Sequence, residues 1–410
     1  MKNITLLSFL IICIINACTE PVSISQWRGP NRDGIYPGSN LLGTWPENGP
    51  EMIWSYDGLG AGHGNVGIGD NSLFICGMPD TTGVLYAFNF AGDLLWKTEY
   101  GEEWHQNYHG SRTTPTIIDG LVYLESGQGV VYCYEENSGN LVWSLDILKN
   151  FSAENIQWGM AESLLVDGDL VFCTPGGPEN NVVALNRFDG STVWTSKGSG
   201  QPAAYCSPIL VEHNNTKLLV TMMAESIIGI DATSGESLWI IEHQQSNKIH
   251  ANTPIYKDGK ILCSSASAKS DLDGTVQIVL SEDGRDAEVK WRNQKVTNLM
   301  NGFIFKDGYL YSSPYNKSIW HCLDWETGEI QYTSDAFDSG PVIYADGLFY
   351  CYSHKGEMAL VKADQKSFNV ISTFSVPLGT KEHWAHPVID DGRLYIRHGD
   401  ALMVYNIAEK

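Results

Sequence analysis

Residues 119–143 read DGLVYLESGQGVVYCYEENSGNLVW, and residues 307–332 read DGYLYSSPYNKSIWHCLDWETGEIQY. Each stretch begins with Asp-Gly, continues with two short runs of β-branched and aromatic residues, and ends on a large aromatic residue after a second turn. Asp-Gly suits a tight hairpin, because both residues tolerate positive φ. The pattern therefore predicts antiparallel strands joined by short turns.

The same phrase recurs along the chain at intervals of about 40–50 residues, which is the period of a propeller blade. The first corner of each copy falls at Gly69-Asp70, Asp119-Gly120, Asp167-Gly168, Glu212-His213, Asp258-Gly259, Asp307-Gly308, Asp346-Gly347 and Asp391-Gly392. The aromatic residue that ends a copy falls at Trp96, Trp143, Trp194, Trp239, Trp291, Tyr332 and Phe374. We expect these aromatic rings to pack between neighbouring blades.

Eight copies predict an all-β fold, an eight-bladed β-propeller of four-stranded antiparallel blades. The eighth copy stops after its third strand, whereas residues 51–56 (EMIWSY) form a spare strand at the other end of the chain. We expect this N-terminal strand to complete the last blade, because pairing the two ends removes exposed sheet edges. The predicted divisions are a signal peptide (1–18), a lead-in segment (19–50) and a single propeller (51–410).

The composition excludes a disordered chain and disfavours a nucleic-acid partner. Of the 410 residues, 43% are hydrophobic and only 18% are charged, which is enough apolar material for a large core. With 26 basic against 48 acidic residues the net charge is -22, so a phosphate backbone would be repelled. We expect no nucleic acid among the partners, and a monomer.

The N-terminus reads MKNITLLSFLIICIINAC. Lys2 precedes an apolar run from Ile4 to Ile15 that is too short to span a bilayer and is typical of a signal peptide. Residues 15–18 (INAC) resemble a bacterial lipobox, so Cys18 is the predicted lipidation site, with ordinary secretion as the alternative. We expect the protein to be exported and anchored by lipid to the cell envelope, at the outer membrane facing the periplasm or at the cell surface.

Seven cysteines remain beyond Cys13 and Cys18, and most lie in apolar strand runs. No two are adjacent and none forms CxxC, so we expect small apolar core residues rather than a disulfide framework.

The repeated phrase resembles the pyrroloquinoline-quinone-like (PQQ-like) propeller repeat over residues ~50–410. The segment Gln26–Gly34 (QWRGPNRDG) is similar to the lead-in of uncharacterised bacterial members. The lipobox followed by a propeller resembles the outer-membrane assembly lipoprotein family of the Bam complex (BamB). Many members of the superfamily bind no quinone.

The resemblance also implies an alternative, a periplasmic PQQ-dependent dehydrogenase that oxidises an alcohol or a sugar. Those enzymes hold PQQ and Ca²⁺ at the propeller axis beneath a ring of two adjacent cysteines, which this sequence lacks. The residue types suitable for such a site are Trp158, Glu162, Asn252, Asn301 and Asp338, but they match no family motif individually. We therefore expect no cofactor and no catalytic residue, with PQQ and Ca²⁺ only under this alternative.

Histidines and aromatic residues gather just before the predicted inner strands. Because inner strands line the central channel, these side chains should converge around one mouth of it. The candidate ligand-binding residues are His63, His109, Trp158, Tyr205, His250, Asn252, Asn301, His383, Trp384 and His386. A polar, aromatic-lined mouth that holds water or a small ligand, metal ligation by two or three imidazoles, and side chains that only shape loops remain open; the prediction assigns no metal site.

The sequence thus predicts a non-catalytic binding or scaffold protein of the bacterial envelope, whose partners are envelope proteins or a small ligand at the channel mouth. A third hypothesis is a polysaccharide-binding propeller in which Trp158, Tyr205 and Trp384 are stacking surfaces.

Overall fold

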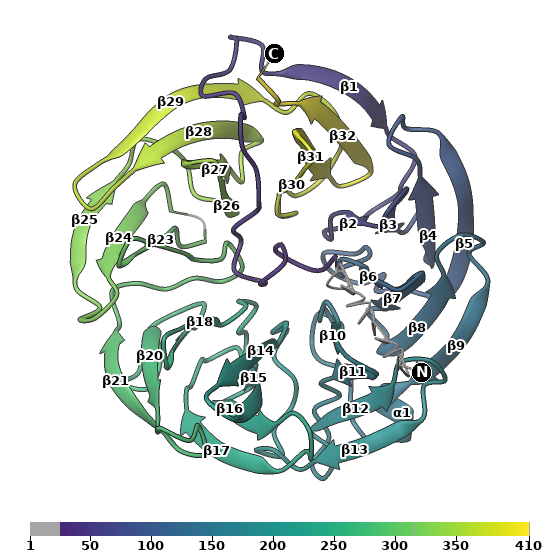
Figure 1. Ribbon diagram of the computed structural model, residues 1–410, viewed down its shortest axis with the longest axis vertical. Helices are drawn as coiled ribbons and strands as arrows, with labels where there is room; N and C mark the ends of the chain where they lie inside the picture. Colours follow the sequence, from purple (N-terminus) through teal and green to yellow (C-terminus); the bar gives the residue numbers. More distant parts are fainter. Residues whose placement is uncertain (1–24, 316, 410) are drawn as a thin grey trace, which may run out of the picture.

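The computed structural model describes residues 25–315 and 317–409 as a ring of eight four-stranded antiparallel sheets (Figure 1). Each sheet is one blade, and its first strand lies nearest the central axis while its last strand lies on the outside of the ring. The predicted eight-bladed propeller is therefore confirmed. The predicted signal peptide and Cys18 lie outside the described residues.

Blades 1 to 4 follow one another along the chain without crossovers. Their strands are β2 (Gly67–Ile68), β3 (Leu73–Gly77), β4 (Thr82–Phe88), β5 (Leu94–Glu102); β6 (Thr116–Ile118), β7 (Leu121–Glu125), β8 (Val130–Glu135), β9 (Leu141–Asp146); β10 (Leu165–Asp167), β11 (Leu170–Cys173), β12 (Val182–Asn186), β13 (Thr192–Ser196); and β14 (Ile209–His213), β15 (Thr216–Met223), β16 (Ser226–Asp231), β17 (Ser237–Glu242). One short helix, α1 (Ile147–Asn150), follows β9 and is capped by the side chain of Asp146.

Blades 5 to 8 continue the ring in the same order. Their strands are β18 (Ile255–Lys257), β19 (Lys260–Ser264), β20 (Thr275–Leu280), β21 (Ala287–Asn293); β22 (Ile304–Lys306), β23 (Tyr309–Ser312), β24 (Trp320–Asp324), β25 (Ile330–Ser334); β26 (Val342–Ala345), β27 (Leu348–Tyr352), β28 (Glu357–Ala363), β29 (Phe368–Ser375); and β30 (Val388–Asp390), β31 (Arg393–His398), β32 (Ala401–Asn406), with β1 (Glu51–Tyr56) as the outer strand of blade 8.

The ring closes where blade 8 meets blade 1, as predicted. Strand β1 pairs with β32 in a register that runs from Glu51 opposite Asn406 to Tyr56 opposite Leu402. The fully buried Arg397 of β31 crosses the same seam and donates to the carbonyls of Gly64 at 2.8 Å and Cys76 at 2.5 Å. Both ends of the chain thus contribute to one blade, and β1 covers the edge that β32 would otherwise expose.

The Asp-Gly corners adopt the geometry that their residue types favour. In five blades the aspartate has φ between 44° and 51° and the following glycine has φ between 69° and 85°, which is the geometry of a type I′ hairpin turn. Blade 4 corrects the sequence prediction, because Glu212 and His213 lie inside β14 and the turn falls at Asn214-Asn215. Asn214 has φ of 53°, so asparagine takes over the left-handed position.

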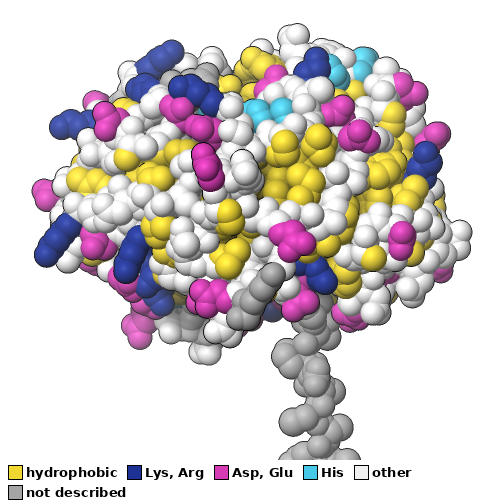
Figure 2. Space-filling view, turned by 90° about the horizontal axis from the view of Figure 1, so that it is seen from above, with side chains coloured by type: hydrophobic (Ala, Val, Ile, Leu, Met, Phe, Trp, Pro, Cys, Tyr) yellow, Lys and Arg dark blue, Asp and Glu magenta, His cyan; other side chains and the backbone are white. Residues whose placement is uncertain are grey.

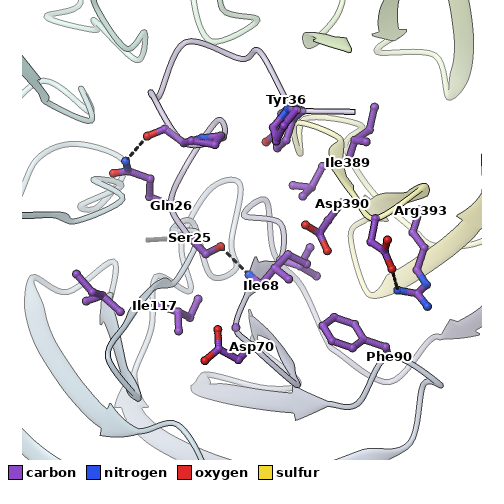
Figure 3. A pocket seen from close by; sticks show the side chains of 18 of the residues that line it. Ser25, Gln26, Tyr36, Ile68, Asp70, Phe90, Ile117, Ile389, Asp390 and Arg393 are labelled. Carbon is purple, nitrogen blue, oxygen red and sulfur yellow. Dashed lines mark hydrogen bonds and ion pairs between the residues drawn. The ribbon is translucent and has the colours of Figure 1, made fainter. Parts of the chain in front are cut away.

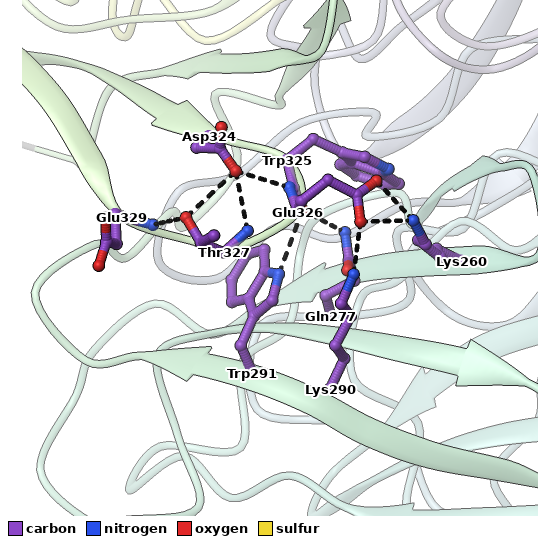
Figure 4. A network of polar contacts seen from close by, with 9 residues as sticks. All are labelled: Lys260, Gln277, Lys290, Trp291, Asp324, Trp325, Glu326, Thr327 and Glu329. Carbon is purple, nitrogen blue, oxygen red and sulfur yellow. Dashed lines mark hydrogen bonds and ion pairs between the residues drawn. The ribbon is translucent and has the colours of Figure 1, made fainter.

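Tryptophans of the outer strands join one blade to the next. The ring nitrogen of Trp143 donates to the carbonyl of Arg187 at 2.8 Å, and that of Trp194 donates to Ala232 at 3.2 Å. Figure 4 shows the same joint between blades 5 and 6, where the indole of Trp291 and the amide of Gln277 both donate to the carbonyl of Trp325. Of the tryptophans predicted to pack between blades, Trp143, Trp194 and Trp291 thus also carry a polar contact.

The seven described cysteines are all buried and unpaired, as predicted. On the wall of the ring, Figure 2 shows hydrophobic side chains among acidic and uncharged ones. Around the whole ring, exposed apolar residues of the described chain lie on the outer strands, namely Ile53, Leu94, Leu95, Leu141, Val142, Val193, Ile240, Val289 and Ile371. None of the described helices is both long and apolar enough to cross a membrane.

Candidate functional site at the channel mouth

The lead-in segment crosses the axis of the ring and fills the channel (Figure 1). Ser25 forms an antiparallel bridge to Ile117 of β6, and Ile35 forms a parallel bridge to Tyr344 of β26. Residues 25–35 thereby span the ring from blade 2 to blade 7. The sequence of this segment resembles a family lead-in, but no local pattern in it predicts a position across the channel.

Two buried arginines hold the segment in the channel. Arg32 donates to the carbonyls of Leu164 at 3.2 Å and Ser163 at 2.5 Å. Arg28 donates to the carbonyl of Phe303 at 2.8 Å and to Nδ1 of His386 at 2.9 Å. Burial lowers the pKa of each guanidinium to about 10, so both remain charged at neutral pH.

A pocket of about 280 Å³ lies above the segment, at one mouth of the channel. Trp27 comes from the lead-in segment, and the other lining residues come from loops that precede inner strands or link blades. The lining is formed by Trp27, His63, Tyr108, Arg112, Trp158, Ala161, Ser163, Tyr205, Ser207, Ile249, Ala251, Leu299, Met300, Tyr315, Trp384 and His386.

Two aromatic groups face the pocket from opposite parts of the ring. On the side of blades 3 and 4, the rings of Trp158 and Tyr205 lie 6.0 Å apart. From the side of blade 8, the ring of Trp384 lies 5.0 Å from that of His63 and 5.2 Å from that of Tyr108. The pocket therefore offers flat apolar surfaces on two sides.

Tyr108 and Tyr205 hold an unusual backbone conformation. Their φ angles are 54° and 68°, in the left-handed region that bulky residues rarely adopt. Such a residue costs on the order of 1–3 kcal/mol, and strained residues of this kind cluster at ligand sites. Both strained side chains line the pocket.

Three hydroxyl groups on the pocket wall each accept a hydrogen bond from a backbone N–H. Ser163 Oγ accepts from Thr114 at 3.0 Å, Ser207 Oγ accepts from Ser163 at 3.0 Å, and the Tyr205 hydroxyl accepts from Trp158 at 3.1 Å. No described residue accepts the hydrogen of any of the three hydroxyls. Each hydroxyl therefore keeps one donor for another partner.

Arg112 is the positively charged group of the pocket wall. Its Nη2 donates to the carbonyl of Tyr108 at 2.6 Å, and its buried Nε has no partner among the described residues. The described arginines that pair with carboxylates are Arg187, Arg285 and Arg393, not Arg112. Burial lowers its pKa to about 10, which leaves it charged at neutral pH.

Of the ten predicted ligand-binding residues, five line this pocket: His63, Trp158, Tyr205, Trp384 and His386. The other five do not line it: His109, His250, Asn252, Asn301 and His383. Asn252 donates to the carbonyl of Leu299 in the next blade, and Asn301 donates to the carbonyl of Ser313 at 3.1 Å. These two amides tie loops together.

The histidines near the mouth are mostly buried and neutral. His386 accepts from Arg28 at Nδ1 and therefore donates from Nε2 to the carbonyl of Met300 at 2.7 Å, so neither ring nitrogen is free. Burial lowers the pKa of His63 to about 3 and that of His250 to about 4. Among the described residues, no three His, Cys, Asp or Glu side chains are grouped so that they could hold a metal ion.

The residues that the sequence offered for binding calcium and PQQ do not suit that role. Burial raises the pKa of Glu162 to about 8, so this carboxyl is neutral where calcium requires charged oxygen. Asp338 pairs with Lys355 at 2.8 Å, and the side-chain oxygen of Asn301 faces the ring of His354. Asn252 belongs to a different loop contact.

Sequence reasoning missed Trp27, Tyr108 and Arg112. The last two lie in the loop of residues 103–115, which already supplied the candidate His109, so the basic residue of that loop was a signal that could have been used. Trp27 gave no signal, because nothing in the sequence places the lead-in segment beneath the mouth.

The opposite end of the axis holds a different hollow, of about 590 Å³, beside Ser25 (Figure 3). In Figure 3 the carboxyl groups of Asp70 and Asp390 point into it. Burial and then the neighbouring Asp391 raise the pKa of Asp390. This acidic hollow is a poor place for an anion, in contrast to the mouth that holds Arg112.

Comparison with known proteins gives relatives of several activities at low identity. Tetrathionate hydrolase of Acidithiobacillus ferrooxidans is 24% identical over 156 residues, 32% of this chain and 29% of the relative. Outer membrane protein assembly factor BamB of Salmonella typhimurium is 28% identical over 119 residues, 27% of this chain and 28% of the relative. Quinoprotein alcohol dehydrogenase PedH of Pseudomonas putida is 25% identical over 178 residues, 41% of this chain and 28% of the relative. The matches thus span less than a third of these relatives.

Solved structures agree on the fold. BamB from Moraxella catarrhalis has a TM-score of 0.61 at 11% identity, over 87% of this chain and 99% of the other. A family model described as "Outer membrane protein assembly factor BamB" matches residues 51–146 and 81–334, more than half of the chain. On the ring of four-stranded blades and this match, the chain belongs to that family.

Proposed function

We propose that the protein is an exported, lipid-anchored β-propeller that acts as a non-catalytic binding protein at the bacterial cell envelope. Support comes from the lipobox-like residues 15–18 and from relatives that are named as outer membrane protein assembly factors. The anchor would hold the ring at the outer membrane, facing the periplasm or the cell surface.

The channel mouth is the single observation that carries the binding function. Its polar groups are largely used to hold the scaffold, as His386 does between Arg28 and Met300. What remains toward the pocket is aromatic surface, three hydroxyl donors, one guanidinium and the neutral imidazole of His63, whose ring nitrogens have no hydrogen-bond partner among the described residues. Such a surface can hold a ligand, but it presents no nucleophile paired with a base.

Envelope proteins are the second class of partner in this proposal. The outer strands of the consecutive blades 8, 1, 2 and 3 each expose apolar side chains, including Ile53, Leu95, Val142 and Val193. Where such side chains form one contiguous patch, the patch is typical of protein interaction surfaces. The acidic net charge of -22 disfavours nucleic acid.

The competing function is a PQQ-dependent dehydrogenase, which the match to PedH favours. The engaged Asn301 and Asp338 and the protonated Glu162 argue against it. The test is dye-linked oxidation of alcohols and sugars by the purified protein with added PQQ and Ca²⁺. We expect no turnover, and turnover that disappears in Asp338→Ala would overturn the non-catalytic proposal.

The anchor is tested by fractionation. Cys18→Ala should leave the protein soluble or as an uncleaved precursor, whereas Cys13→Ala, a cysteine of the same apolar run, should fractionate with membranes like the wild type. Membrane fractionation of Cys18→Ala that equals the wild type would overturn lipidation.

A further inference from the structure

The pocket at the mouth combines features that select a particular ligand class. A purely apolar ligand would leave Nη1 of Arg112 and the hydroxyl hydrogens of Ser163, Ser207 and Tyr205 without acceptors. Buried donors that are left unpaired cost about 1–3 kcal/mol each. The ligand that fits must therefore carry several oxygen acceptors as well as a flat apolar face.

A carboxylate is the group that matches Arg112. A guanidinium pairs most strongly with a planar anion. No described carboxylate lies within ion-pair distance of Arg112, although Glu103 and Glu382 act on its charge from further away. Nη1 has no hydrogen bond within the described chain, and Nε is buried without a partner. The acidic hollow at the other end of the axis offers an anion no comparable cation. Its arginine, Arg393, is already paired, with Nη1 3.5 Å from Oδ2 of Asp391.

A sugar ring is the group that matches the remaining surface. Its axial hydrogens form an apolar face that can lie on Trp158 or Trp384, while its hydroxyl oxygens can accept from Ser163, Ser207 and Tyr205. The volume of about 280 Å³ is small for a pocket that binds drug-sized molecules, and it suits one ring with the remainder of a chain outside.

We propose that the channel mouth binds an acidic saccharide, with a uronic acid ring between the two aromatic groups and its carboxylate on Arg112. This inference deepens the proposed function, since it rests on the protein being a binding protein and names the ligand class. Trp27 forms part of the pocket lining, so the lead-in segment contributes to the same site.

The experiment is titration calorimetry of the full chain with trigalacturonic acid and, as the neutral counterpart, maltotriose. We expect saturable binding of the acidic sugar and at least tenfold weaker binding of the neutral one. Arg112→Gln should weaken the acidic sugar at least tenfold and leave the neutral one unchanged. Arg285→Gln, a surface arginine paired with Glu236, is the matched control and should bind like the wild type.

Substitutions of Trp158 test the contribution of the aromatic surface to sugar affinity. Trp158→Ala should weaken both sugars, and Trp158→Phe should restore part of the affinity, with melting temperatures recorded for each variant to verify folding. Equal binding of acidic and neutral sugars, or acidic binding unchanged in Arg112→Gln, would overturn the assignment of the carboxylate. No saturable binding of either sugar up to 10 mM would overturn the saccharide site.

The proposed function is judged by other readouts. Turnover with PQQ and Ca²⁺ would overturn the non-catalytic proposal whatever the sugar result. If neither sugar binds and no turnover is found, the saccharide site is overturned, whereas the proposal that the protein binds envelope proteins still stands.

Discussion

Arg28 donates to Nδ1 of His386 at 2.9 Å, although 358 residues separate them in the sequence. The contact joins the lead-in segment to the loop before the last blade. The same guanidinium reaches the carbonyls of Phe303 and Asp33, so one side chain links the lead-in to blades 6 and 8. Arg28, near the N-terminus, thus ties the segment that crosses the channel to a loop near the C-terminus.

Arg28→Gln should destabilise the fold. Hydrogen bonds from a charged donor contribute about 1.5–3 kcal/mol each, and a glutamine cannot make all three. We expect the free energy of unfolding in urea to fall by about 3 kcal/mol, with Arg285→Gln as the surface control. A loss below about 0.5 kcal/mol would contradict the role of Arg28 as a link.

Ring closure can be separated from channel filling by two truncations. Removal of residues 19–50 deletes the lead-in but keeps β1, whereas removal of 19–56 also deletes the outer strand of blade 8 and exposes the edge of β32. We expect the longer truncation to melt at lower temperature and to aggregate, because an unpaired edge recruits other strands. Equal melting and monodispersity of the two variants would refute closure by β1.

The polar contact of the outer tryptophans is testable with a matched pair. The ring nitrogen of Trp194 donates to Ala232, whereas that of Trp239 has no partner in the described chain. Trp194→Phe should therefore cost about 1 kcal/mol more than Trp239→Phe in urea unfolding, which is the usual net worth of one hydrogen bond. Equal losses would mean that the indoles act by packing alone.

Glu162 should make the fold less stable as pH rises. Burial raises its pKa from an ordinary 4.5 to about 8, so the unfolded chain loses this proton at a lower pH than the folded chain. The contribution is therefore complete below pH 4.5 and is lost as pH rises to about 8. The loss in unfolding free energy between pH 5 and pH 8 should be smaller by a few kcal/mol in Glu162→Gln. Glu326→Gln, a substitution of an exposed glutamate, should leave the loss in unfolding free energy between pH 5 and pH 8 as in the wild type.

His250 should act in the opposite direction. Burial lowers its pKa from 6.5 to about 4, so the unfolded chain takes up a proton that the folded chain excludes. Its contribution to stability is present above pH 6.5 and is lost as pH falls to about 4. His250→Gln should flatten the fall in melting temperature between pH 6.5 and 4.5 relative to the wild type, with the partly exposed His109→Gln as control. An unchanged slope would contradict a neutral, buried His250.

Local chemistry made the blades predictable from the sequence. Asp119-Gly120 and its equivalents encode hairpins because their residues tolerate positive φ, and Trp143 marks an outer strand by its size and spacing. The degenerate blade 4 shows the limit of this reasoning, since the turn moved to Asn214-Asn215, where asparagine tolerates the same conformation as well as aspartate does.

The candidate site was predictable only in part. The sequence placed His63, Trp158, Tyr205, Trp384 and His386 before inner strands, and the closed ring brings these together at the mouth. It could not separate them from Asn252, Asn301 and His383, because whether a side chain turns into the pocket or ties a loop depends on which carbonyls lie near it.

By itself the sequence determined the number of blades and most of their turns, because these follow from residues close together in the chain. The closing strand was predictable because residues 51–56 were a strand left over when the eighth copy lacked its fourth. Tertiary structure alone decided that residues 25–35 fill the channel and that Trp27 and Arg112 line the mouth. The physical reason is that these positions depend on long-range contacts, which leave no local pattern. Examples are the hydrogen bonds of Arg28 and Arg32 to carbonyls 275 and 132 residues away.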